Sequence, residues 1–296
     1  MKIAIGVGDD DASSDAMALG AALGRSFDDV DNILVHIYDN NHDFVARAGV
    51  EFDWEEHSRE QASKIVANAA QEMASRQDIT DVSTGISGHR ASGHGLAEFA
   101  HDHDCRWIVI GSAPGGSRDR FMIGSTANQL LHGAATPIIL TPGGYRRREV
   151  DQIGRIVVTV ATGREGKRTI RRAAKIARGS KAPLHLITIL LHSNRMIGPL
   201  AKKDQEELIE TAKQQISEQQ AEALADLDLG SLEISSEVVE GDTVADALGQ
   251  VSWEGDDLLI VPSSRGVLHR VFLGDMNYKI VRSSQVATLV LPRFTD

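Results

Sequence analysis

Cysteine is almost absent from this chain of 296 residues, which contains only Cys105. A single cysteine cannot form an internal disulfide, so no disulfide framework supports the fold. Aromatic residues are also scarce: they make up 4% of the chain, whereas 42% of all residues are hydrophobic. The cores must therefore be built mainly from Ile, Leu, Val and Ala, a composition that suits helices packed on a sheet.

Positive charge and long apolar runs are limited as well. The chain has 31 Lys and Arg against 42 Asp and Glu, a formal net charge of −11. An acidic surface argues against non-specific binding to nucleic acids or anionic membranes, both of which need a basic field. No apolar run approaches the roughly 18 residues that span a bilayer, and no signal peptide precedes the first strand-like stretch. We expect a cytoplasmic protein with no membrane insertion and no nucleic-acid partner.

Strand-like and helix-like stretches alternate along the first half of the chain. Apolar strand patterns at 3–7, 33–37, 80–87, 107–110 and before Pro142 are separated by helical patterns at 15–27, 55–74, 95–103 and from Gly124. Such alternation implies right-handed crossovers and a parallel sheet. We therefore predict an α/β fold with helices on both faces of the sheet.

The second half repeats this order. Strand patterns at 155–160, 184–191 and 232–239 alternate with helical patterns at 165–179, 202–225 and 243–251. Residues 258–261 and Gly274 lie 150 positions after residues 108–111 and Gly124, and Pro292 lies 150 positions after Pro142. A constant offset across several elements indicates a tandem duplication. We predict two domains, 1–145 and 152–296.

The stretch 106–142 contains the strongest candidate for a ligand site. A buried strand ends at Gly111, a loop rich in small residues follows, and Gly124, Ser125 and Thr126 open a helix. Unpaired N–H groups and the positive end of the helix dipole favour an anion at such a helix start. This pattern predicts recognition of a phosphate or nucleotide, although a tight strand-to-helix connection alone would also account for it.

At these residues the chain resembles the universal stress protein family, whose nucleotide-binding signature is Gly, two residues, Gly, nine residues, Gly and then Ser or Thr. Gly111, Gly124 and Ser125 match this spacing, whereas Pro114 replaces the inner glycine and is followed by Gly115. Pro114 has no N–H to donate to a phosphate. The resemblance covers nearly all of both halves. It implies, for each half, a five-stranded parallel sheet in the order 3-2-1-4-5, with ligand at the carboxyl ends of strands 1 and 4.

The resemblance also implies that the first half binds ATP, ADP or AMP. The residues that would contact the nucleotide are Val7, Gly8, Asp9, Ile37, Gly111, Ser112, Gly115, Gly124, Ser125 and Thr126. The loop and the helix start would hold the phosphates, and Val7 and Ile37 would contact the base. Family members carry an aspartate near the sugar; here an alignment without a gap places Gly8 there, and a slip of one residue places Asp9 there.

The second half departs from the family pattern. At the constant offset, Val261 and Ser264 stand where the family has glycines, and Ala161 stands where it has the aspartate. Asp275 replaces the hydroxyl at the helix start, where a carboxylate would repel a phosphate and would instead be a good N-cap. We predict that this half keeps the fold and has lost nucleotide binding.

Signals of catalysis and metal binding are weak. The chain has no Gly-x-Ser-x-Gly elbow and no Walker lysine, and His101 and His103 lack the spacing of a zinc site. We expect a nucleotide-responsive binding and regulatory protein of the stress response, with at most slow ATP hydrolysis and no metal beyond nucleotide-associated Mg. A homodimer and an unidentified protein partner are also expected. The alternative is a nucleotide-independent interaction scaffold of the same fold, favoured by Pro114, Ala161 and Asp275.

Overall fold

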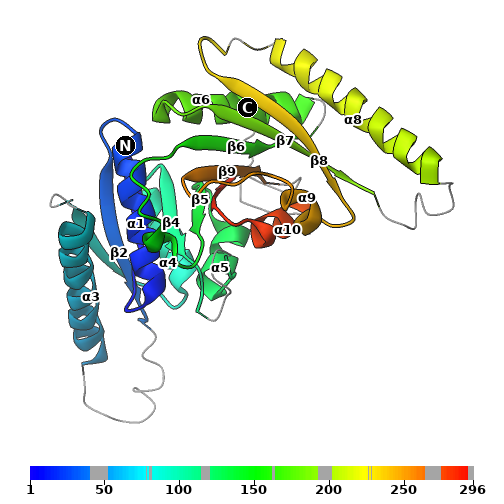
Figure 1. Cartoon of the computed structure of the whole chain (residues 1–296). Coiled ribbons are helices and arrows are strands. Elements are labelled where there is room, and N and C mark those ends of the chain that lie inside the picture. The colour runs from blue at the N-terminus through cyan, green and yellow to red at the C-terminus, as the bar shows by residue number, and fades with distance from the viewer. Residues whose placement is uncertain are drawn as a thin grey trace.

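The computed structural model describes residues 1–40, 53–77, 79, 82–114, 121–161, 164–192, 202–225, 227, 229–263 and 275–292. Within these ranges the chain forms one sheet of ten strands, in the order β3-β2-β1-β4-β5-β10-β9-β6-β7-β8 (Figure 1). No helix in the same ranges combines the length and the apolar character needed to cross a membrane.

The first half has the predicted alternation of strands and helices. Its elements are β1 (Lys2–Gly6), α1 (Asp11–Ser26), β2 (Asp31–Tyr38), α3 (Trp54–Gln77), β3 (Ser83–Gly88), α4 (Ser92–Asp102), β4 (Trp107–Gly111), α5 (Ser125–Gly133) and β5 (Ile138–Thr141). Neighbouring strands pair in parallel. The predicted order 3-2-1-4-5 is confirmed.

The second half repeats these elements after a short 3-10 helix, η1 (Tyr145–Arg148). They are β6 (Arg155–Thr159), α6 (Arg164–Ser180), β7 (Leu184–Leu191), α8 (Lys202–Ala225), β8 (Ile234–Gly241), α9 (Val244–Leu248), β9 (Asp257–Pro262), α10 (Asp275–Ser283) and β10 (Ala287–Leu291). Strands β6 to β10 adopt the same parallel arrangement, 10-9-6-7-8. The duplication predicted from the sequence is therefore confirmed.

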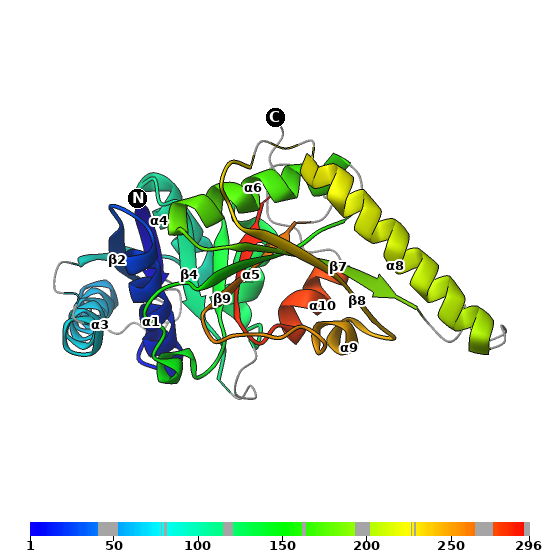
Figure 2. The same cartoon turned by 45° about the horizontal axis from the view of Figure 1, so that its top comes forward.

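Helices cover both faces of the sheet (Figures 1 and 2). Residues of α1, α3 and α6 pack into one hydrophobic core, and residues of α4, α5, α9 and α10 pack into the other. Central strands contribute to both cores, because successive side chains point to opposite faces. Ile108 and Val109, for example, are both fully buried and belong to different cores.

The two halves are joined by an antiparallel pairing of β5 with β10. Ile138 pairs with Val290, Ile139 with Leu289, and Leu140 with Thr288. Because this pairing is antiparallel while each half is parallel, the strands of the two halves run in opposite directions. The carboxyl ends of β1 and β4 therefore lie on one side of the sheet, where these strands end. Those of β6 and β9 lie on the opposite side.

Several element boundaries differ from the predicted ones for identifiable reasons. Helix α1 begins at Asp11 instead of residue 15, because the Asp10 side chain accepts a hydrogen bond from the Ser13 N–H (3.0 Å) and caps the helix. Helix α4 begins before the predicted Gly95 and includes Gly93. A Cβ on Gly93 would lie 2.5 Å from the Thr126 carbonyl oxygen, so this glycine permits close packing of α4 on α5.

A buried carboxylate in α1 holds the segment between the halves. Asp15, which is 3% exposed, accepts hydrogen bonds from the backbone N–H groups of Gly144 (2.7 Å) and Arg146 (3.0 Å). The Arg146 guanidinium lies 3.3 Å from the same carboxylate and 2.8 Å from that of Asp11, whose side chain is 87% exposed. One side chain thus satisfies two backbone donors where the chain leaves the first half.

Replacing Asp15 with Ala should lower the free energy of unfolding by about 2–4 kcal/mol, because two backbone N–H groups and a guanidinium lose a buried acceptor. Asp11→Ala is the matched control, since it removes the exposed partner of the same arginine and should cost less than about 1 kcal/mol. Chemical denaturation followed by circular dichroism measures both values. Equal losses in the two variants would show that Asp15 is not the anchor of this segment.

Candidate functional site

A cavity of about 370 Å³ lies at the carboxyl ends of β1, β2 and β4, next to the starts of α4 and α5. The strand order reverses between β1 and β4, the position where open α/β sheets bind ligands. Eight of the ten residues predicted to contact a nucleotide line this cavity: Val7, Gly8, Ile37, Gly111, Ser112, Gly124, Ser125 and Thr126. The structure thus brings together residues from four separate segments of the chain.

The other two predicted residues are not part of this lining. Gly115 lies outside the described residues, and Asp9 is exposed to solvent. Asp10 lines the cavity in its place and accepts a hydrogen bond from the Ser13 hydroxyl (2.9 Å), which in turn accepts one from the Gly8 N–H (2.6 Å). Sequence analysis considered Gly8 and Asp9 and missed Asp10. The sequence did contain a signal for Asp10. An N-cap side chain accepts a hydrogen bond from the backbone N–H three residues later, and that residue is Ser13.

Gly111 allows a backbone contact that no other residue would permit. A Cβ at this position would lie 2.0 Å from the carbonyl oxygen of Ala12, in the first turn of α1. Such a contact cannot be relieved by a side-chain rotation, because the backbone fixes the position of the Cβ and the Ala12 oxygen is itself a backbone atom. The glycine therefore brings the end of β4 against α1 and closes one side of the cavity, with or without a ligand.

The hydroxyl groups predicted to approach a phosphate have different partners in the structure. Ser112 Oγ accepts a hydrogen bond from the Met122 N–H (2.8 Å), and Thr126 Oγ1 lies 2.6 Å from Ser92 Oγ in α4. These two hydroxyls hold the loop and the α4–α5 contact. Gly124 is the N-cap of α5 and makes no side-chain cap bond, and Ser125, the first helical residue, is exposed. The first turn of α5 therefore keeps N–H donors that no cap residue satisfies.

His36, at the end of β2, is a lining residue that sequence analysis missed. Its Nδ1 atom lies 2.8 Å from the Val7 carbonyl oxygen. A carbonyl can only accept, so Nδ1 donates the proton, and in the neutral ring Nε2 remains as an acceptor. The sequence pattern favoured the apolar Ile37 for base contact and gave no signal for the histidine, whose placement depends on the pairing of β1 with β2.

The strand pairing corrects the predicted equivalence between the two halves. Gly111 pairs with Thr141, the residue before Pro142, and Pro262 pairs with Leu291, the residue before Pro292. Pro262, not Val261, therefore occupies the place of Gly111. The offset of 150 residues between the halves is therefore wrong at β9. The segment between Pro262 and Gly274 is one residue shorter than the segment between Gly111 and Gly124 in the first half. Proline offers no N–H to a ligand, so the departure from the family pattern is larger than predicted.

Asp275 lies in the first position of α10, one residue inside the helix and not at its N-cap as predicted. The N-cap position precedes the first helical residue. The same relation holds in the first half, where Gly124 is the N-cap and Ser125 the first residue of α5. Asp275 and Ser125 therefore occupy the same position in their helices.

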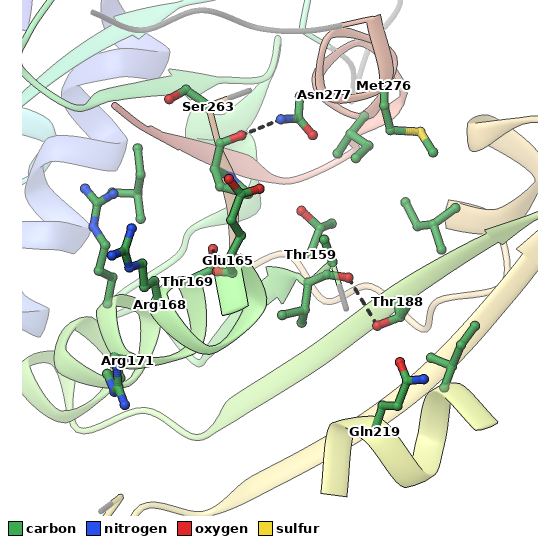
Figure 3. Close-up of a pocket in the computed structure, with 18 of the residues that line it drawn as sticks. Thr159, Glu165, Arg168, Thr169, Arg171, Thr188, Gln219, Ser263, Met276 and Asn277 are labelled. Carbon is green, nitrogen blue, oxygen red and sulfur yellow. Dashed lines mark hydrogen bonds between the residues drawn. The ribbon is translucent and has the colours of Figure 1, made fainter. Parts of the chain in front are cut away.

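A larger cavity, of about 1070 Å³, lies in the second half and was not foreseen from the sequence. It begins at the carboxyl ends of β6, β7 and β9 and extends between α6, α8 and α10 (Figure 3). Its lining includes Arg168, Arg171 and Arg172 of α6 and residues of one face of α8. The lining also contains Ala161 and Pro262, the second half's counterparts of the predicted pattern, but the arginines of α6 and the residues of α8 lie outside that pattern.

Two observations on the described part of the chain concern metal binding and nucleophilic chemistry. No group of three or more His, Cys, Asp or Glu side chains there is arranged to hold a metal ion. Burial raises the pKa of the Cys105 thiol, which disfavours the nucleophilic thiolate. The arrangement at both cavities is suited to holding a ligand.

The sequence of this chain matches the model of the Universal stress protein family at residues 1–142 and 152–292. The chain belongs to the universal stress protein family and contains two such domains in tandem. A universal stress protein of Mycobacterium tuberculosis (strain H37Rv) is 29% identical over 246 residues, covering 83% of this chain and 84% of the relative.

Solved structures share the fold across the whole chain. A universal stress protein from Archaeoglobus fulgidus DSM 4304 has a TM-score of 0.62 at 12% identity, covering 99% of this chain and 98% of that one. A structure from Pseudomonas aeruginosa UCBPP-PA14 has a TM-score of 0.54 at 17% identity, covering 98% and 93%. At these identities the likeness shows the fold alone.

Gly111→Ala should lower the free energy of unfolding by about 1–3 kcal/mol, because the new methyl group forces β4 away from α1. Gly8→Ala is the matched control from the same cavity, since its Cβ would lie 3.7 Å from Ser13 Oγ, an ordinary contact. We expect the control to change stability by less than about 0.5 kcal/mol. Thermal and chemical unfolding of both variants measure the difference, and a Gly111→Ala protein as stable as Gly8→Ala would contradict the close approach.

Proposed function

We propose that this chain is a nucleotide-responsive binding and regulatory protein whose N-terminal half holds one adenine nucleotide, ATP, ADP or AMP. The observation that carries this proposal is the convergence of eight predicted residues on one cavity at the strand-order reversal. The cavity volume of about 370 Å³ lies within the range of small-molecule sites.

The phosphates would lie at the start of α5. Gly124 makes no side-chain cap bond, so the helix N–H groups and the positive dipole end are available to an anion. Ser125 adds a hydroxyl there, whereas the Ser112 and Thr126 hydroxyls already have partners. Most of the phosphate recognition therefore falls on the helix start, as expected when Pro114 removes one N–H from the loop.

The sugar and base would lie towards β1 and β2. Gly8 and Asp10 line this side, and Asp10 has already accepted hydrogen bonds from Ser13, so its contact with a ribose would use its remaining lone pairs. Ile37 supplies an apolar contact for a base, and His36 Nε2 is an acceptor suited to an exocyclic amino group. We propose binding and regulation without catalysis, with magnesium present only through the nucleotide.

The alternative proposal is a nucleotide-independent interaction scaffold of the same fold, acting on a protein partner or as a homodimer. The engagement of the Ser112 and Thr126 hydroxyls within the protein favours it, because hydroxyls that already have partners are less available to a phosphate. Mass spectrometry of the natively purified protein separates the two proposals: a co-purifying adenine nucleotide supports the first, and a stable protein partner without nucleotide supports the second.

Titration calorimetry with ATP should give at most one site per chain. The second half presents Pro262 and Asp275 where the first presents Gly111 and Ser125, so it lacks a backbone donor and carries a carboxylate residue at the helix start. A stoichiometry of two would contradict the proposed asymmetry between the halves.

Ser125→Asp should weaken ATP binding by at least about tenfold, because a carboxylate then lies where a phosphate should bind. Folding should be unaffected, since an acidic residue in the first turn of a helix is favourable. Asn128→Asp is the matched control: it adds the same charge to an exposed position of α5 outside the cavity. Thermal melting with and without ATP measures both effects. If Ser125→Asp retains the full ATP-induced shift, the phosphates bind elsewhere.

A further inference from the structure

Helix α6 carries three arginines at positions where the equivalent residues of α1 are buried. Counted from the first residue of each helix, the fifth, eighth and ninth positions are Asp15, Ala18 and Leu19 in α1 and Arg168, Arg171 and Arg172 in α6. All three residues of α1 are buried, whereas Arg168 and Arg171 are exposed and Arg172 is half-buried. The two halves therefore differ in a helix that the nucleotide signature does not include.

This difference separates α6 from the long helix next to it. In the first half, α3 buries Val66, Ala69 and Met73 in the core that it shares with the sheet and α1. In the described part of α8, Gln220 is the one buried residue, and Leu208 is 50% exposed. The C-terminal part of α8 packs against the core through Ala223 and Leu224 and contacts α6. Burying arginine side chains in a dry interface is costly, which disfavours a closer packing of the rest of α8 on α6. Figure 2 shows α8 extending outward from the rest of the molecule.

The resulting cavity has walls of two kinds. The three arginines of α6 form a cationic wall, which we define as Arg168, Arg171 and Arg172. The opposite walls combine apolar and amide side chains. Helix α8 contributes Ala212 and Ile216 beside Gln215 and Gln219, and α10 contributes Met276 and Ile280 beside Asn277. Figure 3 shows Arg168 and Arg171 on α6, with Gln219 of α8 across the cavity and Asn277 of α10 at another side.

The described residues that line the larger cavity carry a net positive charge, although the protein as a whole is acidic. Glu165 is the only carboxylate among the lining residues that the structure describes, against the three arginines of the cationic wall. Arg172 donates a hydrogen bond from Nη1 to the Pro292 carbonyl oxygen (2.8 Å). Burial lowers the pKa of its guanidinium, so an anion in the cavity would offset the hydration that this group has lost.

We propose that the C-terminal half binds an amphipathic organic anion, a carboxylate on a long alkyl chain, in the cavity between α6, α8 and α10. The carboxylate lies at the cationic wall, where a planar guanidinium can donate two hydrogen bonds to it. The alkyl chain lies against Ala212, Ile216 and Ile280. A nucleotide fits this site poorly, because Pro262 lacks the N–H that a phosphate would use.

The test uses the full-length protein and dodecanoate below its micelle concentration, followed by titration calorimetry. We expect saturable binding of one dodecanoate per chain. Dodecanol, which has the chain without the charge, and butanoate, which has the charge without the chain, should each bind at least about tenfold more weakly. Absence of saturable dodecanoate binding, or equal binding of dodecanol, would overturn the proposal. Both comparisons use the unaltered protein and do not depend on a variant folding.

Two pairs of variants then locate the site. Arg171→Glu should weaken dodecanoate binding by at least about tenfold, the effect of losing one charge-assisted hydrogen bond. Lys175→Glu makes the same charge change on the same helix outside the lining and should bind as the unaltered protein does. Ile216→Trp should weaken binding by filling the cavity, whereas Leu208→Trp, on an exposed part of α8, should not. Equal effects within either pair would overturn the location.

Competition separates this site from the proposed nucleotide site. Dodecanoate binding should persist at saturating ATP and in the Ser125→Asp variant, because the two cavities lie at opposite edges of the sheet. Displacement of dodecanoate by ATP would identify the larger cavity as a nucleotide site and overturn the inference. If ATP does not bind at all, the proposed nucleotide function is contradicted. The dodecanoate titration still tests the carboxylate site by itself.

Discussion

The pairing of β5 with β10 is the interaction on which the arrangement of the whole molecule depends. Each half alone would expose the backbone donors and acceptors of an apolar edge strand, and such an edge promotes aggregation. Joining the two edges satisfies those groups and buries Ile138, Ile139, Leu289 and Val290 completely. Because the pairing is antiparallel, the carboxyl ends of the parallel strands point in opposite directions in the two halves. The duplicated fold therefore offers two separate cavities, each free to change without altering the other.

The two proposed sites would attract an anion in different physical ways, in a protein with a net charge of −11. In the first half the donors belong to the backbone at the start of α5, where geometry and the helix dipole supply the positive potential. In the second half the positive charge comes from arginine side chains along α6. Backbone donors suit a compact, multiply charged group such as a phosphate. A line of guanidinium groups facing a wall that contains Ala212, Ile216 and Ile280 suits a ligand that is charged at one end only.

Much of the glycine pattern reflects close packing in addition to any ligand. Gly111 is required by the approach of Ala12, and a Cβ on Gly124 would lie 2.9 Å from the Ala113 Cβ. Both contacts lie beside the smaller cavity, so the same residues shape the site and hold the elements around it together. A glycine-rich signature is therefore sound evidence for this local backbone geometry and weaker evidence for a bound nucleotide.

The sequence by itself determined the alternation of strands and helices, the duplication and the helix start at Gly124, because apolar periodicity and capping act between residues close together in the chain. It also identified eight residues that meet at one cavity, since parallel strands end at the same edge. Only the tertiary structure decided that His36 joins this cavity, that Pro262 takes the place of Gly111, and that part of α8 extends outward from the rest of the molecule. Each of these depends on strand register or on contacts between helices distant in sequence, which no local pattern encodes.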